Sequence, residues 1–141
     1  MTKAAKGTSS TVVPIRGEGD DAGTEFKKKW GPKVAERGFC MVPSLLLKAQ
    51  LRLGLSAQEL NVMLHLMDHW WRADSRPWPS QATLAQRMNI QPRQVRRILN
   101  RLRAAGLVDW EARYKEDKGR LSNAYDLSGL VKKLKKLGPR I

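Results

Sequence analysis

The tightest restriction on the fold comes from the stretch Asn89-Ile90-Gln91-Pro92, which separates two segments with helical spacing of apolar residues. Asparagine tolerates the left-handed conformation that ends many helices, and proline is favoured in the first turn of a helix. The two residues therefore predict a tight turn between two helices. We expect the second of these, over about residues 91–105, to be a recognition helix.

This predicted helix has two contrasting faces. Apolar residues with one-face spacing would pack it onto a core: Val95, Ile98, Leu99 and Leu102. The opposite face is rich in arginine and amide side chains, and such a face suits the major groove of DNA, where arginine pairs with guanine or phosphate and amides pair with adenine. The predicted base-reading residues are Arg93, Gln94, Arg97 and Asn100.

A β-hairpin is expected directly after this helix. Apolar and charged residues alternate from Leu107 to Tyr114, residues 115–119 form a turn-rich tip, and residues 121–127 can return as the partner strand. A hairpin in this place is a wing. The residues predicted to contact the DNA backbone come from this wing, from the flanks of the recognition helix and from the start of the helix before it: Arg113, Lys115, Lys118 and Arg120, then Arg96 and Arg101, then Ser80 and Gln81.

The remaining patterns divide the chain into three parts. Residues 1–38 are small, polar and basic, which predicts a disordered tail. Residues 39–127 contain the predicted winged helix-turn-helix domain, with earlier helices over 44–53 and from the capping box at Ser56 to about Trp71. Residues 128–141 alternate leucines and lysines as a basic amphipathic helix. The expected fold class is mainly α with a small β-hairpin wing.

Charge indicates the kind of partner. The chain has 27 Lys and Arg against 13 Asp and Glu, a formal net charge of +14, and such a surface attracts a polyanion such as double-stranded DNA. No apolar run approaches the roughly 18 residues of a membrane span, and the polar first residues do not resemble a secretion signal. We therefore expect a cytoplasmic, nucleoid-associated bacterial protein without a membrane partner.

The sequence gives little support for catalysis or for a metal site. His65 and His69 are four residues apart on a helix, a spacing that can hold a metal, but Cys40 is the one obvious additional ligand. No glycine-rich phosphate loop or nucleophile motif is present. We expect no enzyme activity, metal or cofactor.

Two sets of residues resemble known families. Winged-helix modules of phage and plasmid replication proteins and of small bacterial regulators are similar to the segments Trp78-Pro79-Ser80-Gln81, Leu84-Ala85, Val95 to Leu102 and Gly106-Leu107-Val108. The amino-terminal domain of the primosome protein DnaD is similar to Val42-Pro43-Ser44-Leu45-Leu46 and to Leu55 through Leu60. Together these cover about residues 39–127. The resemblance implies a recognition helix in the major groove and a wing against the backbone.

Three functions remain open. The first is a sequence-specific transcriptional regulator, expected as a homodimer because two half-sites multiply the discrimination of one short helix. The second is a replication or partition accessory protein of a phage or plasmid, with a protein partner from that machinery. The third is a self-association module, which the broad apolar arc of the helix from Ser56 to Trp71 favours.

Overall fold

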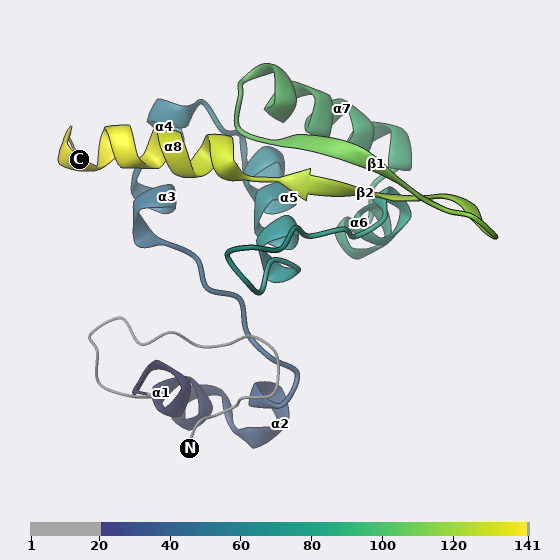
Figure 1. The fold of residues 1–141 in the computed structure, drawn as a ribbon. Coiled ribbons are helices and arrows are strands. Elements are labelled where there is room, and N and C mark those ends of the chain that lie inside the picture. Colours follow the sequence, from purple (N-terminus) through teal and green to yellow (C-terminus); the bar gives the residue numbers. More distant parts are fainter. Residues whose placement is uncertain (1–20, 141) are drawn as a thin grey trace.

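The computed structural model describes residues 21–140 and places a set of helices around one β-hairpin (Figure 1). The elements in chain order are α1 (Asp21–Trp30), α2 (Pro32–Ala35), α3 (Ser44–Lys48), α4 (Gln50–Leu53), α5 (Ala57–Asp68), α6 (Gln81–Met88), α7 (Pro92–Ala104), β1 (Asp109–Lys115), β2 (Gly119–Asp126), α8 (Ser128–Leu137) and a 3-10 turn (Gly138–Arg140). The expected mainly helical fold with a small hairpin is confirmed.

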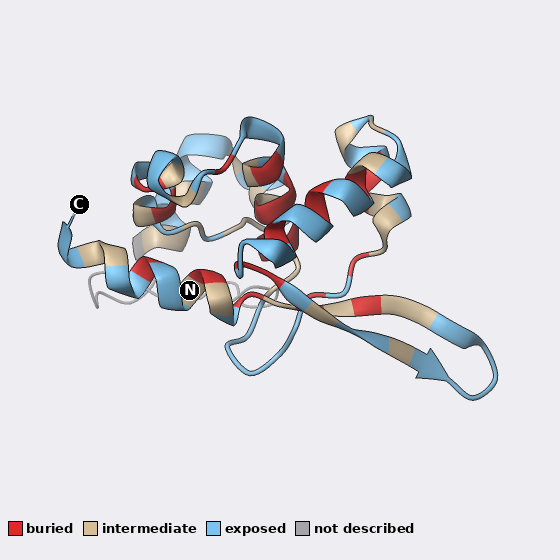
Figure 2. Cartoon of the chain, turned by 90° about the horizontal axis from the view of Figure 1, so that it is seen from above, coloured by how far each residue is buried: buried red, intermediate tan, exposed pale blue. Residues whose placement is uncertain are grey.

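The core lies among α3, α5, α6, α7, α8 and the base of the hairpin, and the positions that it buries are red in Figure 2. All four apolar residues of the predicted α7 stripe are buried: Val95, Ile98, Leu99 and Leu102. They meet Val62, Met63 and Leu66 of α5 and the hairpin base in one cluster. Burial of this stripe fixes which face of α7 is left for solvent.

The turn between α6 and α7 has the predicted geometry. Asn89 ends α6 in the left-handed conformation, with φ 56° and ψ 48°, and Pro92 is the first residue of α7. The start of α5 is equally well defined, because Ser56 Oγ accepts from Glu59 N at 3.1 Å and Glu59 Oε1 accepts from Ser56 N at 2.8 Å. Local sequence signals thus set the end of α6 and the starts of α7 and α5.

The wing contains an irregularity that alternation alone did not predict. Trp110 pairs with Tyr125, and Arg113 pairs with Leu121, with a register shift between Glu111 and Arg113. Two residues of β2, Ser122 and Asn123, thus lie opposite one residue of β1, Ala112, which is a β-bulge on β2. Beyond the bulge Arg113 is half-buried, whereas Tyr114, expected on the apolar face, is exposed.

Three other segments differ from the expected outline. Part of the predicted tail, residues 21–35, forms α1 and α2, where Phe26 stacks on Phe39 at 4.8 Å between ring centroids; residues 1–20 lie outside the described part. The helix expected over 44–53 is split at Ala49 into α3 and α4. Finally, α5 ends at Asp68, whose carbonyl oxygen accepts from Trp71 Nε1 at 2.8 Å, rather than continuing to Trp71.

Candidate nucleic-acid interface

The outer face of α7 presents its first arginines to solvent. Arg93, Arg96, Arg97 and Asn100 are exposed. Within the described residues, the ion pairs that α7 makes come instead from its later arginines, Arg101 and Arg103. The cations near the start of the helix are therefore unneutralised and free to meet phosphates or base edges.

Arg101 is held by a buried partner. Its Nη1 donates to Glu59 Oε2 at 2.7 Å, and the Glu59 side chain is 5% exposed whereas that of Arg101 is 61% exposed. The pKa of Glu59 is lowered, first by the hydrogen bond from Ser56 N and then by Arg101. Arg101 thus compensates a buried carboxylate with one edge of its guanidinium, which leaves its other donors for the predicted backbone contact.

Gln94 is also partly engaged. Its Oε1 accepts from Gln91 N at 3.1 Å, so the carbonyl end of the amide satisfies the first turn of α7. The amide nitrogen remains available as a donor. A predicted base reader therefore also orders the helix start that it projects from.

Arg103 joins the recognition helix to the wing, a role that the sequence did not suggest. Its Nε donates to Asp109 Oδ1 at 2.8 Å, and its guanidinium carbon lies 4.1 Å from the centre of the Trp110 ring. Asp109 also accepts from Trp110 N, which is the first cause of the lowered pKa of its carboxyl group. These contacts fix the angle at which β1 leaves α7.

The predicted contacts at the α6 start are held by the fold. Ser80 Oγ accepts from Thr83 N at 3.0 Å and so caps α6. Gln81 is half-buried near the hydroxyl of Tyr125, a group whose pKa is raised by burial. Ser80 and Gln81 therefore serve the packing between α6 and β2, in addition to any DNA contact.

The predicted cations of the wing fall into two groups. Lys115 and Lys118 are exposed at the tip. Arg120 donates to Asn123 Oδ1 at 2.7 Å, and Arg113 Nη1 donates to the Ser122 carbonyl oxygen at 3.2 Å. The tip is thus free, whereas the middle of the wing holds its arginines in place.

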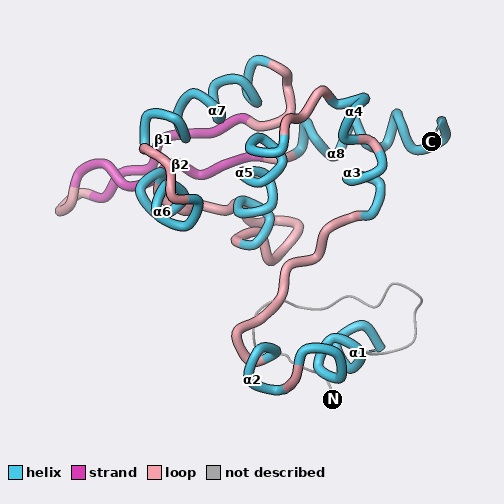
Figure 3. Tube along the Cα trace, turned by 180° about the vertical axis from the view of Figure 1, so that it is seen from behind, coloured by secondary structure: helices cyan, strands magenta, loops and turns pink. Residues whose placement is uncertain are grey.

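These groups lie at one end of the domain. The start of α7, helix α6 and the hairpin tip are together there, and α8 with α3 and α4 is at the other end (Figures 1 and 3). The arrangement brings the predicted base readers and wing cations to a common side of the fold.

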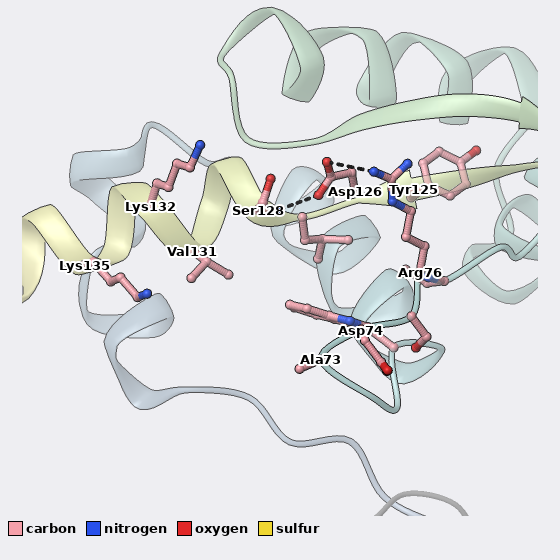
Figure 4. Close-up of a pocket in the computed structure, with 13 residues that line it drawn as sticks. Ala73, Asp74, Arg76, Tyr125, Asp126, Ser128, Val131, Lys132 and Lys135 are labelled. Carbon is pink, nitrogen blue, oxygen red and sulfur yellow. Dashed lines mark hydrogen bonds and ion pairs between the residues drawn. The ribbon is translucent and has the colours of Figure 1, made fainter.

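A cavity of about 450 Å³ lies away from the end of the domain that carries the start of α7. It is between the loop after α5, the end of β2 and α8 (Figure 4). Arg76 pairs with Glu111 at 3.1 Å and with Asp126 at 3.5 Å, and Asp126 accepts from Ser128 N at 2.9 Å. Lys132 and Lys135 of α8 also line the cavity. The contacts of Asp126 join the end of the hairpin to the start of α8.

The histidine pair lies away from any cluster of metal ligands. His69 Nδ1 is 3.1 Å from the carbonyl oxygen of His65, which orients the ring along α5. Burial lowers the pKa of His65 and favours its neutral form. Between residues 21 and 140, no three His, Cys, Asp or Glu side chains come together as a metal site would require.

Comparison with known proteins matches this geometry. The model of the DnaD N-terminal domain family matches residues 42–138, so it extends through α8 and past the domain boundary expected at 127. Among solved structures, the N-terminal domain of DnaD from Geobacillus kaustophilus is 28% identical, with 77% of this chain and 94% of that chain covered and a TM-score of 0.55. A protein from Ralstonia eutropha described as DNA-binding is 25% identical, with coverages of 59% and 98% and a TM-score of 0.41.

No curated protein matches the chain. None of the helices described is long and apolar enough to cross a membrane. The family match and the Geobacillus structure confirm both the resemblance to DnaD and the winged-helix class that the sequence predicted.

Proposed function

Because this chain belongs to the DnaD N-terminal domain family, we propose that it is a non-catalytic DNA-binding module of a replication assembly. In this proposal the first half of α7 enters the major groove of double-stranded DNA and the wing follows the phosphate backbone. Family membership supports the replication alternative over the transcriptional regulator that the sequence also suggested. The protein partner would then be another component of the replication machinery.

One observation carries the proposal: Arg93, Arg96 and Arg97 are exposed together on α7 and pair with no acidic group in the described part of the chain. Keeping three like charges unneutralised on one helix is unfavourable unless an anion meets them. A duplex supplies closely spaced phosphates and releases counterions on binding. The formal net charge of +14 also favours binding to a polyanion such as DNA.

Fluorescence anisotropy with a labelled duplex of about two helical turns tests the proposal. We expect Arg93→Ala and Arg97→Ala each to weaken binding by about fivefold or more, and to lower the slope of log K against log salt by about 1 for a lost phosphate contact. Arg140→Ala is the matched control, because Arg140 is exposed just after α8 at the opposite end. Equal affinities for all three variants would refute DNA binding by α7.

A second candidate function is self-association, including the predicted homodimer. Leu51 is 91% exposed and Leu47, four residues earlier, is 55% exposed. Two leucines one turn apart on a solvent face favour contact with another apolar surface. We infer that the α3–α4 segment is where two copies of the chain would meet.

Sedimentation equilibrium tests this second candidate. Wild-type protein should associate as its concentration rises, and Leu51→Glu should remain monomeric because it would bury a charge in the interface. Leu51→Met, which keeps an apolar side chain, is the control. A monomeric wild type at every concentration would exclude the dimer.

A further inference from the structure

Trp78 lies where the wing meets the start of α6, and 57% of its surface is exposed. Its neighbours Pro77 and Pro79 are buried, and its carbonyl oxygen accepts from Ser122 Oγ at 2.8 Å. The backbone on both sides of the ring is therefore fixed. A large apolar ring in a rigid place and open to water needs an explanation other than a loose end of the chain.

Arg113 covers one part of this ring. Its guanidinium carbon is 4.7 Å from the ring centre, and its Nη1 donates to the carbonyl oxygen and to Oγ of Ser122 at 3.2 and 3.4 Å. The same serine thus holds both the Arg113 cation and the backbone from which the indole projects. Among the described residues Arg113 has no ion pair, so its charge is available to an anion beside the ring.

Trp78 and Arg113 lie beside the elements that are proposed to bind the duplex. Trp78 is two residues before the cap of α6, and Arg113 is on β1, at the end of the domain that carries the start of α7 (Figure 3). Trp71 is similarly exposed, at 60%, but follows α5 on the loop beside the cavity, where its Nε1 is bonded to the Asp68 carbonyl oxygen. Trp71 and Trp78 therefore offer a natural comparison.

We propose that Trp78 and Arg113 form a stacking site for an unpaired DNA base, so that the module prefers a junction of double- and single-stranded DNA to a continuous duplex. The inference rests on the proposed function, because α7 would hold the double-stranded arm. Within a duplex each base is covered on both faces by its neighbours. Beyond the junction a base is uncovered, and an indole braced by a guanidinium is a typical platform for it.

The chemistry favours a base over an apolar peptide. Stacking needs a flat aromatic ring and tolerates any base, and the adjoining phosphate needs a nearby cation. Trp78 and Arg113 supply one of each, already ordered by Ser122, so that little conformational entropy is lost on binding.

The test compares three DNA molecules with the same duplex: one with blunt ends, one with a 3′ thymine overhang and one with a 5′ overhang. Wild-type protein should bind at least one overhang about tenfold more tightly than the blunt duplex, as one stacked base implies. Trp78→Ala should lose that preference and keep its affinity for the blunt duplex. Trp71→Ala, the matched control, should keep both.

A second measurement does not depend on the alanine variant folding. Binding of the preferred overhang should quench tryptophan fluorescence more in the wild type than in Trp78→Phe, which keeps an aromatic ring and should retain part of the preference. Equal binding of all three DNA molecules by the wild type would overturn the inference. So would an equal loss for blunt and overhang DNA in Trp78→Ala, since a purely structural brace gives that result.

Failure of the proposed function looks different. If Arg93→Ala and Arg97→Ala leave blunt-duplex binding unchanged while the overhang preference remains, α7 does not read the duplex but the stacking site stands. If they weaken blunt and overhang binding alike while Trp78→Ala changes no ratio, α7 binds DNA and the stacking site is absent.

Discussion

Replacing Gly129 with alanine should destabilise the fold, although a helix ordinarily gains from such a change. Gly129 is the second residue of α8, and its Cα faces the turn between α7 and β1. A Cβ at this position would lie 2.1 Å from the carbonyl oxygen of Gly106. Because that oxygen belongs to the backbone, it cannot rotate out of the way.

The magnitude follows from the separation required. Real Cβ contacts are essentially never under 3.0 Å, so the two backbones must part by about 1 Å. Overpacking of this kind costs about 1–3 kcal/mol. The hydrogen bond from Leu130 N to Leu107 O, 3.0 Å long, would stretch and lose about 1 kcal/mol. Higher helix propensity offsets about 1 kcal/mol, which leaves a net destabilisation of about 1–3 kcal/mol.

Urea unfolding followed by circular dichroism measures this change. Gly138→Ala is the matched control, because Gly138 has helical dihedrals (φ −46°, ψ −50°) and its added Cβ would meet Leu45 Cδ2 at an ordinary 3.6 Å. We expect the control to cost less than Gly129→Ala, because its added Cβ meets no distant backbone atom and the remaining cost is that of a helical alanine before Pro139. A Gly129→Ala protein as stable as the wild type would refute the close approach of α8 to the Gly106 turn.

Three further predictions concern single side chains. The pKa of Glu59 is lowered in the fold, so this carboxylate stabilises the protein above the pKa of the unfolded chain, and the contribution is lost as the pH falls. The Tm difference between wild type and Glu59→Gln should therefore shrink below about pH 4.5. A constant difference would contradict this. Ser80→Ala should lose about 1 kcal/mol in urea unfolding, whereas Ser80→Asp, which can still cap α6, should not. Burial raises the pKa of the Cys40 thiol to about 11, so a disulfide reagent at about pH 8 should label it far more slowly in folded protein than in urea, and equal rates would exclude a shielded thiol.

Much of the fold was readable because its signals are local. The spacing of Val95, Ile98, Leu99 and Leu102 requires one buried face, and the structure buries all four. Asn89 and Pro92 fix the turn through their own backbone preferences. The family resemblance likewise depended on short segments around these elements and was confirmed by the match over residues 42–138.

The parts that could not be predicted depend on distant contacts. Arg101 meets Glu59 from 42 positions along the chain, and no local pattern announces that pair. The bulge in β2 is equally invisible to alternation, because it results from pairing with β1. By contrast, the spacing of Gln91 and Gln94 matches that of a capping box, so the engagement of Gln94 had a local signal.

The residues of the predicted interface divide in the same way, into those that local sequence predicts and those that depend on distant contacts. The exposure of Arg93, Arg96 and Arg97 follows from the α7 stripe alone. The roles of Arg103 and Arg113 as links to Trp110 and Trp78 do not, because each depends on where the wing leaves the helix.

The bulge in β2 also determines how this wing tolerates changes in length. Deleting Ser122 or Asn123 would restore one-to-one pairing with β1 and exchange the two faces of β2 between the deletion and the tip. Insertions at the hairpin tip, between Lys115 and Gly119, leave that register untouched. Homologues should therefore vary in length at the tip while keeping the residue count between Leu121 and Ala124 constant.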